Sequence, residues 1–170
     1  AEVIQGLREL GISKLVMMTG DNEKTARSVA EAVGLTEFHA GVLPEDKANY
    51  IRAEHAAGRK VIMLGDGVND SPALSEADVG IAIRDGAAIA REVADITVGA
   101  DNLYGLLTLK KLSDALMARI HHNYRFIISF NFMLICLGVA GILPPATSAL
   151  FHNASTLMIS LRSMTNLLEA

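Results

Sequence analysis

The sequence predicts an α/β fold, with a Rossmann-like parallel sheet in residues 1–100 and two transmembrane helices near the end of the chain. Three observations support this prediction. Short apolar runs of strand length alternate with helical patterns of about ten residues, which is typical of a parallel sheet with crossover helices. Small polar turns follow two of the strands, at the edge where open α/β sheets bind ligands. Residues 126–143 contain no formal charge and have about the length that crosses a bilayer.

Residues 1–60 supply the first half of the α/β pattern. Apolar positions with helical spacing predict a helix over residues 2–10, and Gly11 follows as its C-terminal cap. The other elements follow from apolar runs and from Pro or Gly at helix ends, with strands at 15–18 and 38–42 and helices at 23–33 and 44–57.

Residues 61–100 complete the pattern. Residues 61–64 form a continuous apolar run with a β-branched start, which predicts a strand buried on both faces of the sheet. A short helix then begins near Pro72. We further predict strands at 79–83 and 96–98, with a helix at 86–94 between them. The sheet is expected to lack its beginning.

The loop after residues 61–64 carries two carboxylates, Asp66 and Asp70. With Asn69 they offer hard oxygen ligands of the kind that bind Mg²⁺. Gly65 and Gly67 would allow backbone conformations closed to other residues and a close approach of a ligand to the main chain. The loop therefore predicts a cation and phosphate site at the end of this strand.

The same loop leads into a helix that Asp70 or Ser71 could cap, leaving N–H groups directed at an anion. The alternative is that Gly, Asn and Asp only form a turn, where these residues are common. Turn chemistry does not require the ten-residue stretch GDGVNDSPAL, which favours a site.

A second loop has the same architecture. Thr19, Gly20 and Asp21 follow a predicted strand, and their hydroxyl and N–H groups could donate to a phosphoryl group. The alternative is that Thr19 and Asp21 only cap the next helix. Lys47 stands in the first turn of the helix that starts at Pro44, where a cation opposes the helix dipole unless an anion lies in front of it. An ordinary solvated lysine is the alternative there.

The last third of the chain predicts membrane insertion. Residues 101–125 form a linking helix with a basic end, which marks the cytoplasmic side by the positive-inside rule. Residues 126–143 and 146–165 are then two transmembrane helices in a lipid bilayer. Residues 1–125 would lie on the cytoplasmic side, and the cell membrane is the expected location. A buried soluble helix is the alternative for residues 126–143.

Polar side chains interrupt both predicted spans. Asn131 lies in the first and His152 and Asn153 in the second, and such groups are costly at membrane depth unless they face a bundle interior or an ion path. Ser155 and Thr156 share a helix face with His152. Hydrogen bonding between the two helices is the alternative use of these groups.

Composition excludes several function classes. The 170 residues carry a net charge of −4 with interspersed signs, which predicts no nucleic-acid partner because such a surface needs a clustered basic face. Cys136 is the single cysteine, so neither an intrachain disulfide nor a CxxC metal site can form. The mean hydropathy of +0.32 is high for a soluble protein.

Three of these features in one order carry a resemblance to a known family: GDGVNDSPAL, the TGD turn of residues 19–21, and the PxxK start of the helix at residues 44–47. The chain resembles the C-terminal part of a P-type cation-transporting ATPase of the haloacid-dehalogenase-like superfamily. Because two membrane helices are predicted after the phosphorylation domain, it resembles more narrowly the heavy-metal-transporting branch.

The resemblance implies a role for each candidate residue, with ATP as phosphoryl donor and Mg²⁺ as cofactor. It implies that Asp66 binds Mg²⁺, that Asp70 orders the site beside it, that Lys47 neutralises phosphoryl charge and that Thr19 hydrogen-bonds the phosphoryl oxygens. The remaining loop residues would line the cofactor site: Gly20, Asp21, Gly65, Gly67 and Asn69.

Departures from the family pattern limit what this chain can do. No DKTGT motif occurs in it, and the nucleotide-binding and actuator domains of the family are missing. We therefore expect this chain alone neither to autophosphorylate nor to transport, and the N-terminal half of the same pump to be its partner. The alternatives are a haloacid-dehalogenase-like phosphatase and a non-catalytic truncated membrane protein.

The resemblance also bears on the transported ion. The run from His152 to Thr156 resembles the His-Glu-Gly-Ser/Thr motif of cobalt- and zinc-type members, with Asn153 in place of the acid. Asn131 falls where copper pumps carry a Tyr-Asn pair, but Phe130 precedes it here. We therefore expect a transition metal ion of the Zn, Co or Cd type, with copper as the alternative.

Overall fold

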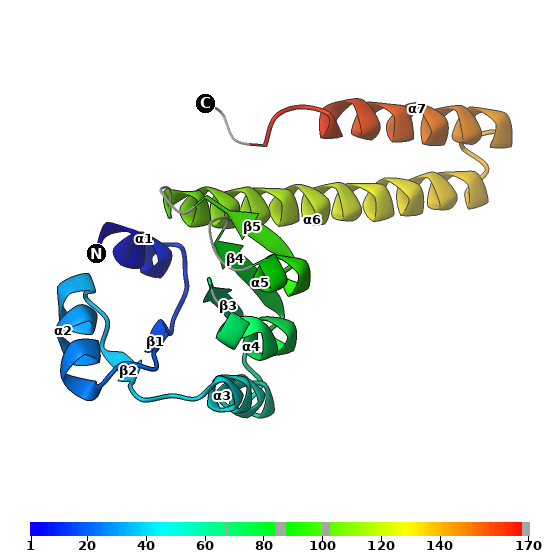
Figure 1. Ribbon diagram of the computed structural model, residues 1–170. Coiled ribbons are helices and arrows are strands. Elements are labelled where there is room, and N and C mark those ends of the chain that lie inside the picture. Colours follow the sequence, from blue (N-terminus) through cyan, green and yellow to red (C-terminus); the bar gives the residue numbers. More distant parts are fainter. Residues whose placement is uncertain (67, 84–87, 100–102, 168–170) are drawn as a thin grey trace. The chain divides into compact units, whose positions relative to one another are not determined.

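The structure is a computed structural model that describes residues 1–66, 68–83, 88–99 and 103–167. It divides into two compact units, residues 1–108 and residues 109–170. Figure 1 shows the elements, which are α1 (Glu2–Glu9), β1 (Val16–Met18), α2 (Glu23–Val33), β2 (Glu37–His39), α3 (Pro44–Ala56), β3 (Ile62–Gly65), the 3₁₀ turn η1 (Val68–Asp70), α4 (Ser71–Glu76), β4 (Val79–Ile83), α5 (Ala88–Val93), β5 (Ile96–Val98), α6 (Tyr104–Val139) and α7 (Pro145–Ser163).

The strands of the first unit form two parallel sheets, whereas the sequence predicted one. β1 pairs with β2, with Val16 opposite Glu37. In the second sheet β4 lies between β3 and β5, so that Ile62 faces Val79 and Ile81 faces Ile96. The predicted α/β class with parallel strands is confirmed, and crossover helices follow the strands as that pairing requires.

Several boundaries match the prediction because local signals set them. Asn22 caps α2, where its side chain accepts a hydrogen bond from Thr25 N at 3.0 Å, and Gly34 ends this helix with a φ of 81°. β2 ends at His39, earlier than predicted. Gly41 adopts a φ of 62° after it, and this left-handed conformation ends an extended run.

β3 is not buried on both faces, which corrects the sequence prediction. The side chains at alternate positions Ile62 and Leu64 are 53% and 37% exposed, whereas Gly65 is buried. The strand is at the edge of its sheet, and α4 packs against its other face. An apolar run alone does not reveal whether a second layer covers a strand.

The core of the first unit consists mostly of alanines, with Ile51 and Leu74 as its largest fully buried side chains. Ala26 and Ala30 bury one face of α2. Leu74 of α4 and Ala82 of β4 form a second cluster with Met63 and Ala94 packed around it. Gly80 permits this packing, because a Cβ there would lie 2.7 Å from the main-chain oxygen of Leu74. The short helix α4 therefore packs closely against β3 and β4, the sheet from which the Asp66 loop extends.

The second unit contains most of α6 and all of α7, which lie side by side in Figure 1. α6 is continuous, so the predicted linking helix and the predicted span at 126–143 share one helix; residues 101 and 102 of the linker lie outside the described residues. It ends at Val139, before the prolines, at a turn where Gly141 has a φ of 72°. Pro144 and Pro145 begin α7 instead.

None of the helices in the described part of the chain is both long enough and apolar enough to cross a membrane. The predicted spans at 126–143 and 146–165 therefore lack support from the structure. Two features explain the difference: the uncharged part of α6 stops at Val139, and α7 carries the polar residues His152, Asn153 and Ser160.

Candidate functional site

The loop after β3 presents its two carboxylates in different environments. Asp66 follows the strand directly and is exposed, whereas Asp70 ends the turn η1 with 7% of its surface exposed. Asn69 lies between them and is exposed. Asp70 begins α4 but its side chain makes no capping hydrogen bond, which corrects the predicted capping role.

Among the described contacts, two donors bind the Asp70 carboxylate. Lys47 Nζ lies 2.7 Å from Asp70 Oδ1, and both side chains are nearly buried, at 12% and 11% exposure. The backbone N–H of Asp66 donates to Asp70 Oδ2 at 3.2 Å. A cation in the first turn of a helix is unfavourable unless an anion lies near it. For Lys47 that anion is the carboxylate of Asp70, and the contact joins α3 to the loop after β3.

Gly65 is needed for a reason that differs from the prediction. It is not among the residues with positive φ. A Cβ at this position would lie 2.6 Å from Cβ of Asp70, so the glycine makes room for that side chain. Gly67, also predicted to contact a cofactor, lies outside the described residues.

The turn after β1 is held by its own hydrogen bonds. Thr19 Oγ1 donates to Asp21 Oδ2 at 3.0 Å and accepts from the N–H of Asp21 at 3.1 Å. Because that N–H is used within the turn, Asp21 is a poorer anion donor than the sequence suggested, while Gly20 is exposed. Neither Thr19 nor Asp21 caps α2, since Asn22 does so. The alternative reading of this turn as a helix cap is thus wrong.

Backbone hydrogen bonds connect this turn to the loop that leads into α3. Val42 N–H donates to the main-chain oxygen of Thr19 at 3.0 Å, and Gly41 N–H donates to that of Asp21 at 2.8 Å. Lys47 follows this loop within the first turn of α3. The structure therefore brings Lys47, Asp66 and Asp70 together and links the Thr19 turn to the same helix start.

The donor set at the end of β3 fits Mg²⁺. This ion prefers oxygen ligands, commonly one or two carboxylates with several waters. Asp66 offers an exposed carboxylate, with Asp70 oriented beside it by Lys47 and by the Asp66 N–H. Asp66 is accordingly the residue that would hold the ion, because it is exposed, whereas the carboxylate of Asp70 is nearly buried and paired with Lys47.

The polar residues of the second unit partly come together. His152 Nδ1 lies 2.9 Å from Asn131 Oδ1, which joins α7 to α6. The hydroxyls of Ser155 and Thr156 both donate to the main-chain oxygen of His152. Their hydrogen bonds are therefore made within α7 and not to α6. Within the described residues, no group of three or more His, Cys, Asp or Glu side chains could hold a metal ion.

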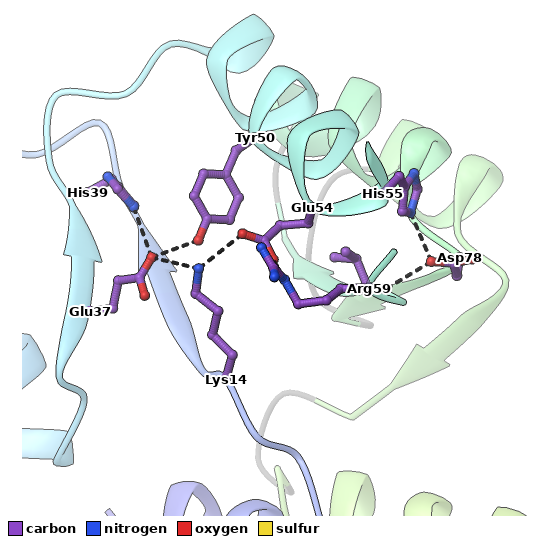
Figure 2. Close-up of polar contacts among 9 residues, drawn as sticks. Lys14, Glu37, His39, Tyr50, Glu54, His55, Arg59 and Asp78 are labelled. Atoms are coloured by element: carbon purple, nitrogen blue, oxygen red, sulfur yellow. Dashed lines mark hydrogen bonds and ion pairs between the residues drawn. The ribbon is translucent and has the colours of Figure 1, made fainter. Parts of the chain in front are cut away.

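A polar cluster that the sequence analysis missed lies beside α3 (Figure 2). Lys14 Nζ lies 3.1 Å from Glu37 Oε1 and 3.0 Å from Glu54 Oε1. The Tyr50 hydroxyl donates to the same Glu37 oxygen at 2.7 Å, and Arg59 pairs with Glu54. No motif signals this cluster, because its members come from four separate places in the sequence.

Comparison with known proteins gives consistent results. The model of the haloacid dehalogenase-like hydrolase family matches residues 1–78. A zinc-exporting P-type ATPase of Mycobacterium marinum is 40% identical over 94% of this chain and 22% of its own length. A copper-transporting P-type ATPase of Rhizobium leguminosarum is 45% identical over 85% of this chain and 17% of its own.

A solved structure matches nearly the whole chain. The crystal structure of a zinc-transporting PIB-type ATPase in the E2.Pi state superposes with a TM-score of 0.91, at 32% identity, over 99% of this chain and 27% of that one. The match includes both α6 and α7, since it leaves almost no residue out. The chain spans about a fifth of the length of the curated relatives it matches.

Proposed function

Because this chain belongs to the heavy-metal branch of the P-type ATPases, within the haloacid dehalogenase-like superfamily, we propose that it is part of an ATP-driven pump that exports a transition metal ion. The observation that carries the proposal is the buried Lys47–Asp70 pair beside the exposed Asp66, at the C-terminal end of a parallel strand. Such a site suits phosphoryl transfer, where positioning and charge neutralisation supply most of the catalysis.

Each residue of the site has a proposed role in this reaction. Asp66 would hold Mg²⁺, with Asp70 orienting the loop around it. Bound Mg²⁺ neutralises charge on the phosphoryl oxygens. Lys47 contributes a positive charge on a fixed helix turn. The Thr19 hydroxyl would exchange its contact with Asp21 for a phosphoryl oxygen, with the N–H of the exposed Gly20 as a second donor.

The aspartate that carries the phosphoryl group belongs, in this proposal, to another part of the whole protein, since the chain contains no DKTGT motif. The two sheets support this assignment. Among the described strands β1 pairs only with β2, and β3 only with β4, so each has an open edge. A further strand that carries the aspartate can pair there through its main chain. The chain by itself is then inactive.

The ion path is proposed to involve the hairpin of α6 and α7. Asn131 and His152 are joined at 2.9 Å, which brings the two candidate ligands together and is also the contact expected from the alternative, hydrogen bonding between the two helices. Asn153 makes no described contact with them and is the weaker candidate. An imidazole suits zinc and copper alike, and the relatives named for zinc and for copper agree with a transition metal cargo.

We also propose that residues 126–143 and 146–165 of this hairpin lie in the membrane part of the pump, with residues 1–125 on the cytoplasmic side. The support is a stripe of large exposed apolar side chains on each helix, because exposed apolar patches mark protein or membrane contacts. The stripes are Ile128, Phe132, Ile135 and Val139 on α6, and Leu150, Leu157, Met158 and Leu161 on α7.

The test is metal-dependent phosphorylation of the whole protein by γ-labelled ATP. The wild type should form an acid-stable phosphoenzyme when the transported metal is present. Asp66→Ala should abolish it, whereas His152→Ala should retain Mg²⁺-dependent chemistry and shift the concentration or identity of the stimulating metal. A phosphoenzyme that survives Asp66→Ala would contradict the role of the loop, and an unchanged metal profile in His152→Ala would contradict the ion site.

A further inference from the structure

The polar cluster beside α3 joins the β1–β2 sheet to this helix (Figure 2). Lys14 lies between two carboxylates, Glu37 at the start of β2 and Glu54 in the last turn of α3. Tyr50 of α3 completes a closed set of contacts, because its hydroxyl donates to Glu37 and its ring centroid lies 5.2 Å from Lys14 Nζ. Both carboxylates are therefore shared between sequence-distant elements.

Burial and charge show that the cluster is a specific contact. Glu54 is only 8% exposed, and a carboxylate is rarely buried unless it is paired. The hydrogen bond from Arg59, and then that from Lys14, lowers the pKa of Glu54 to about 2. The Tyr50 hydroxyl lowers the pKa of Glu37, and contact with Tyr50, then with Glu54, raises that of Lys14. All the charged forms are thus favoured together.

The cluster lies at the opposite end of these elements from the phosphoryl site. Lys14 precedes β1 and Thr19 follows it, a separation of roughly 16 Å along an extended strand. Glu54 and Lys47 are seven residues apart on α3 and share one face, about 10 Å apart along the helix axis. β1 and α3 therefore each have a cluster residue at one end and a residue of the phosphoryl site, Thr19 or Lys47, at the other.

At the site end the same elements are tied by the backbone hydrogen bonds from Val42 to Thr19 and from Gly41 to Asp21. If these hydrogen bonds were the only contacts, α3 could rotate relative to the β1–β2 sheet about the loop of residues 40–43. The polar cluster adds contacts at the other end of the helix. Contacts at both ends together fix the distance between Thr19 and Lys47.

We propose that Lys14 is a positioning residue for phosphoryl transfer, which holds the β1–β2 sheet against α3 so that Thr19 and Lys47 act on one phosphoryl group. This inference rests on the proposed function. Lys14 touches no reacting atom, and its effect passes through Glu37 and Glu54. Small displacements of positioned groups are costly, and about 1 Å can reduce a rate on the order of 100-fold.

The experiment compares three variants of the whole protein. Lys14→Met removes the charge and keeps a long side chain, and Lys14→Arg restores the charge. Arg52→Met is the matched control: Arg52 lies on the same helix and pairs with Glu76 of α4 at 2.9 Å, so its loss weakens α3 without loosening it from the β1–β2 sheet. Three quantities are measured: the rate of phosphoenzyme formation at saturating ATP, the amide exchange rates of Gly41 and Val42, and the melting temperature.

We expect Lys14→Met to slow phosphorylation on the order of tenfold or more, and to accelerate exchange at Gly41 and Val42 by a similar factor. Lys14→Arg should recover most of both losses. Arg52→Met removes an exposed pair, so it should lower the melting temperature less than Lys14→Met and leave both rates near wild type. A role of Lys14 in stability alone would instead give the two Met variants the same rates.

The two rates separate this inference from the proposed function. A wild-type protein that forms no phosphoenzyme contradicts the proposed function, while the exchange rates still decide whether Lys14 couples the two ends of α3. Unchanged exchange at Gly41 and Val42 in Lys14→Met overturns the inference, and so does faster exchange with an unchanged rate of phosphorylation.

Discussion

Replacing Lys47 with methionine tests how much the buried ion pair contributes to this fold. The substitution preserves the length of the side chain and removes the ammonium group 2.7 Å from Asp70 Oδ1. At this distance an effective dielectric constant of 20 gives a Coulomb energy of about 6 kcal/mol. Part of it is offset because the variant no longer desolvates a lysine. A loss of about 3–5 kcal/mol in the free energy of unfolding is therefore expected.

The assay is urea unfolding followed by circular dichroism, with a chelator present so that no divalent ion replaces the lost charge. Lys60→Met is the matched control: Lys60 Nζ also lies 2.7 Å from a carboxylate, that of Asp78, but its side chain is 88% exposed. That variant should differ little from wild type, since exposed pairs are screened by water and salt. Adding Asp70→Asn to Lys47→Met should recover part of the loss. Equal losses in the two lysine variants would refute the argument from burial.

Two further predictions concern the cluster and the hairpin. The pKa of Glu54 is about 2 in the folded protein, against an ordinary value of 4.5, so its contribution to stability is present above about pH 4.5 and is lost as the pH falls towards 2. Glu54→Gln should therefore be less stable than wild type at pH 6 and lose less stability between about pH 5 and 2; parallel curves would contradict the pairing. Membranes from cells that make this chain should retain it after alkaline carbonate extraction, and a truncation after residue 108 should be released. Release of both would contradict the membrane placement of the hairpin.

Much of the fold could be predicted because its signals are local. The bounds of α2 follow from an Asn cap, apolar spacing and a terminal Gly, all within a few residues. The strand β4 was likewise predicted with its observed limits. Two of the failures have a different cause. The exposure of β3 and the separation into two sheets depend on which elements lie opposite one another, and no local pattern carries that information. The end of α6 at Val139 instead follows a local signal, the turn at Gly141 with its φ of 72°, which the prediction passed over in favour of the prolines.

The candidate site divides in the same way. The sequence by itself determined which residues carry chemistry, because a short loop rich in Gly, Asn and Asp after an apolar strand is distinctive wherever it occurs. Only the tertiary structure decided how they are used. It paired Lys47 with Asp70, made Gly65 leave room for that carboxylate, and bound the N–H of Asp21 to the Thr19 hydroxyl. It also joined Lys14 to Glu54 across 40 residues, a contact set by the packing of strand and helix and therefore invisible in either segment alone.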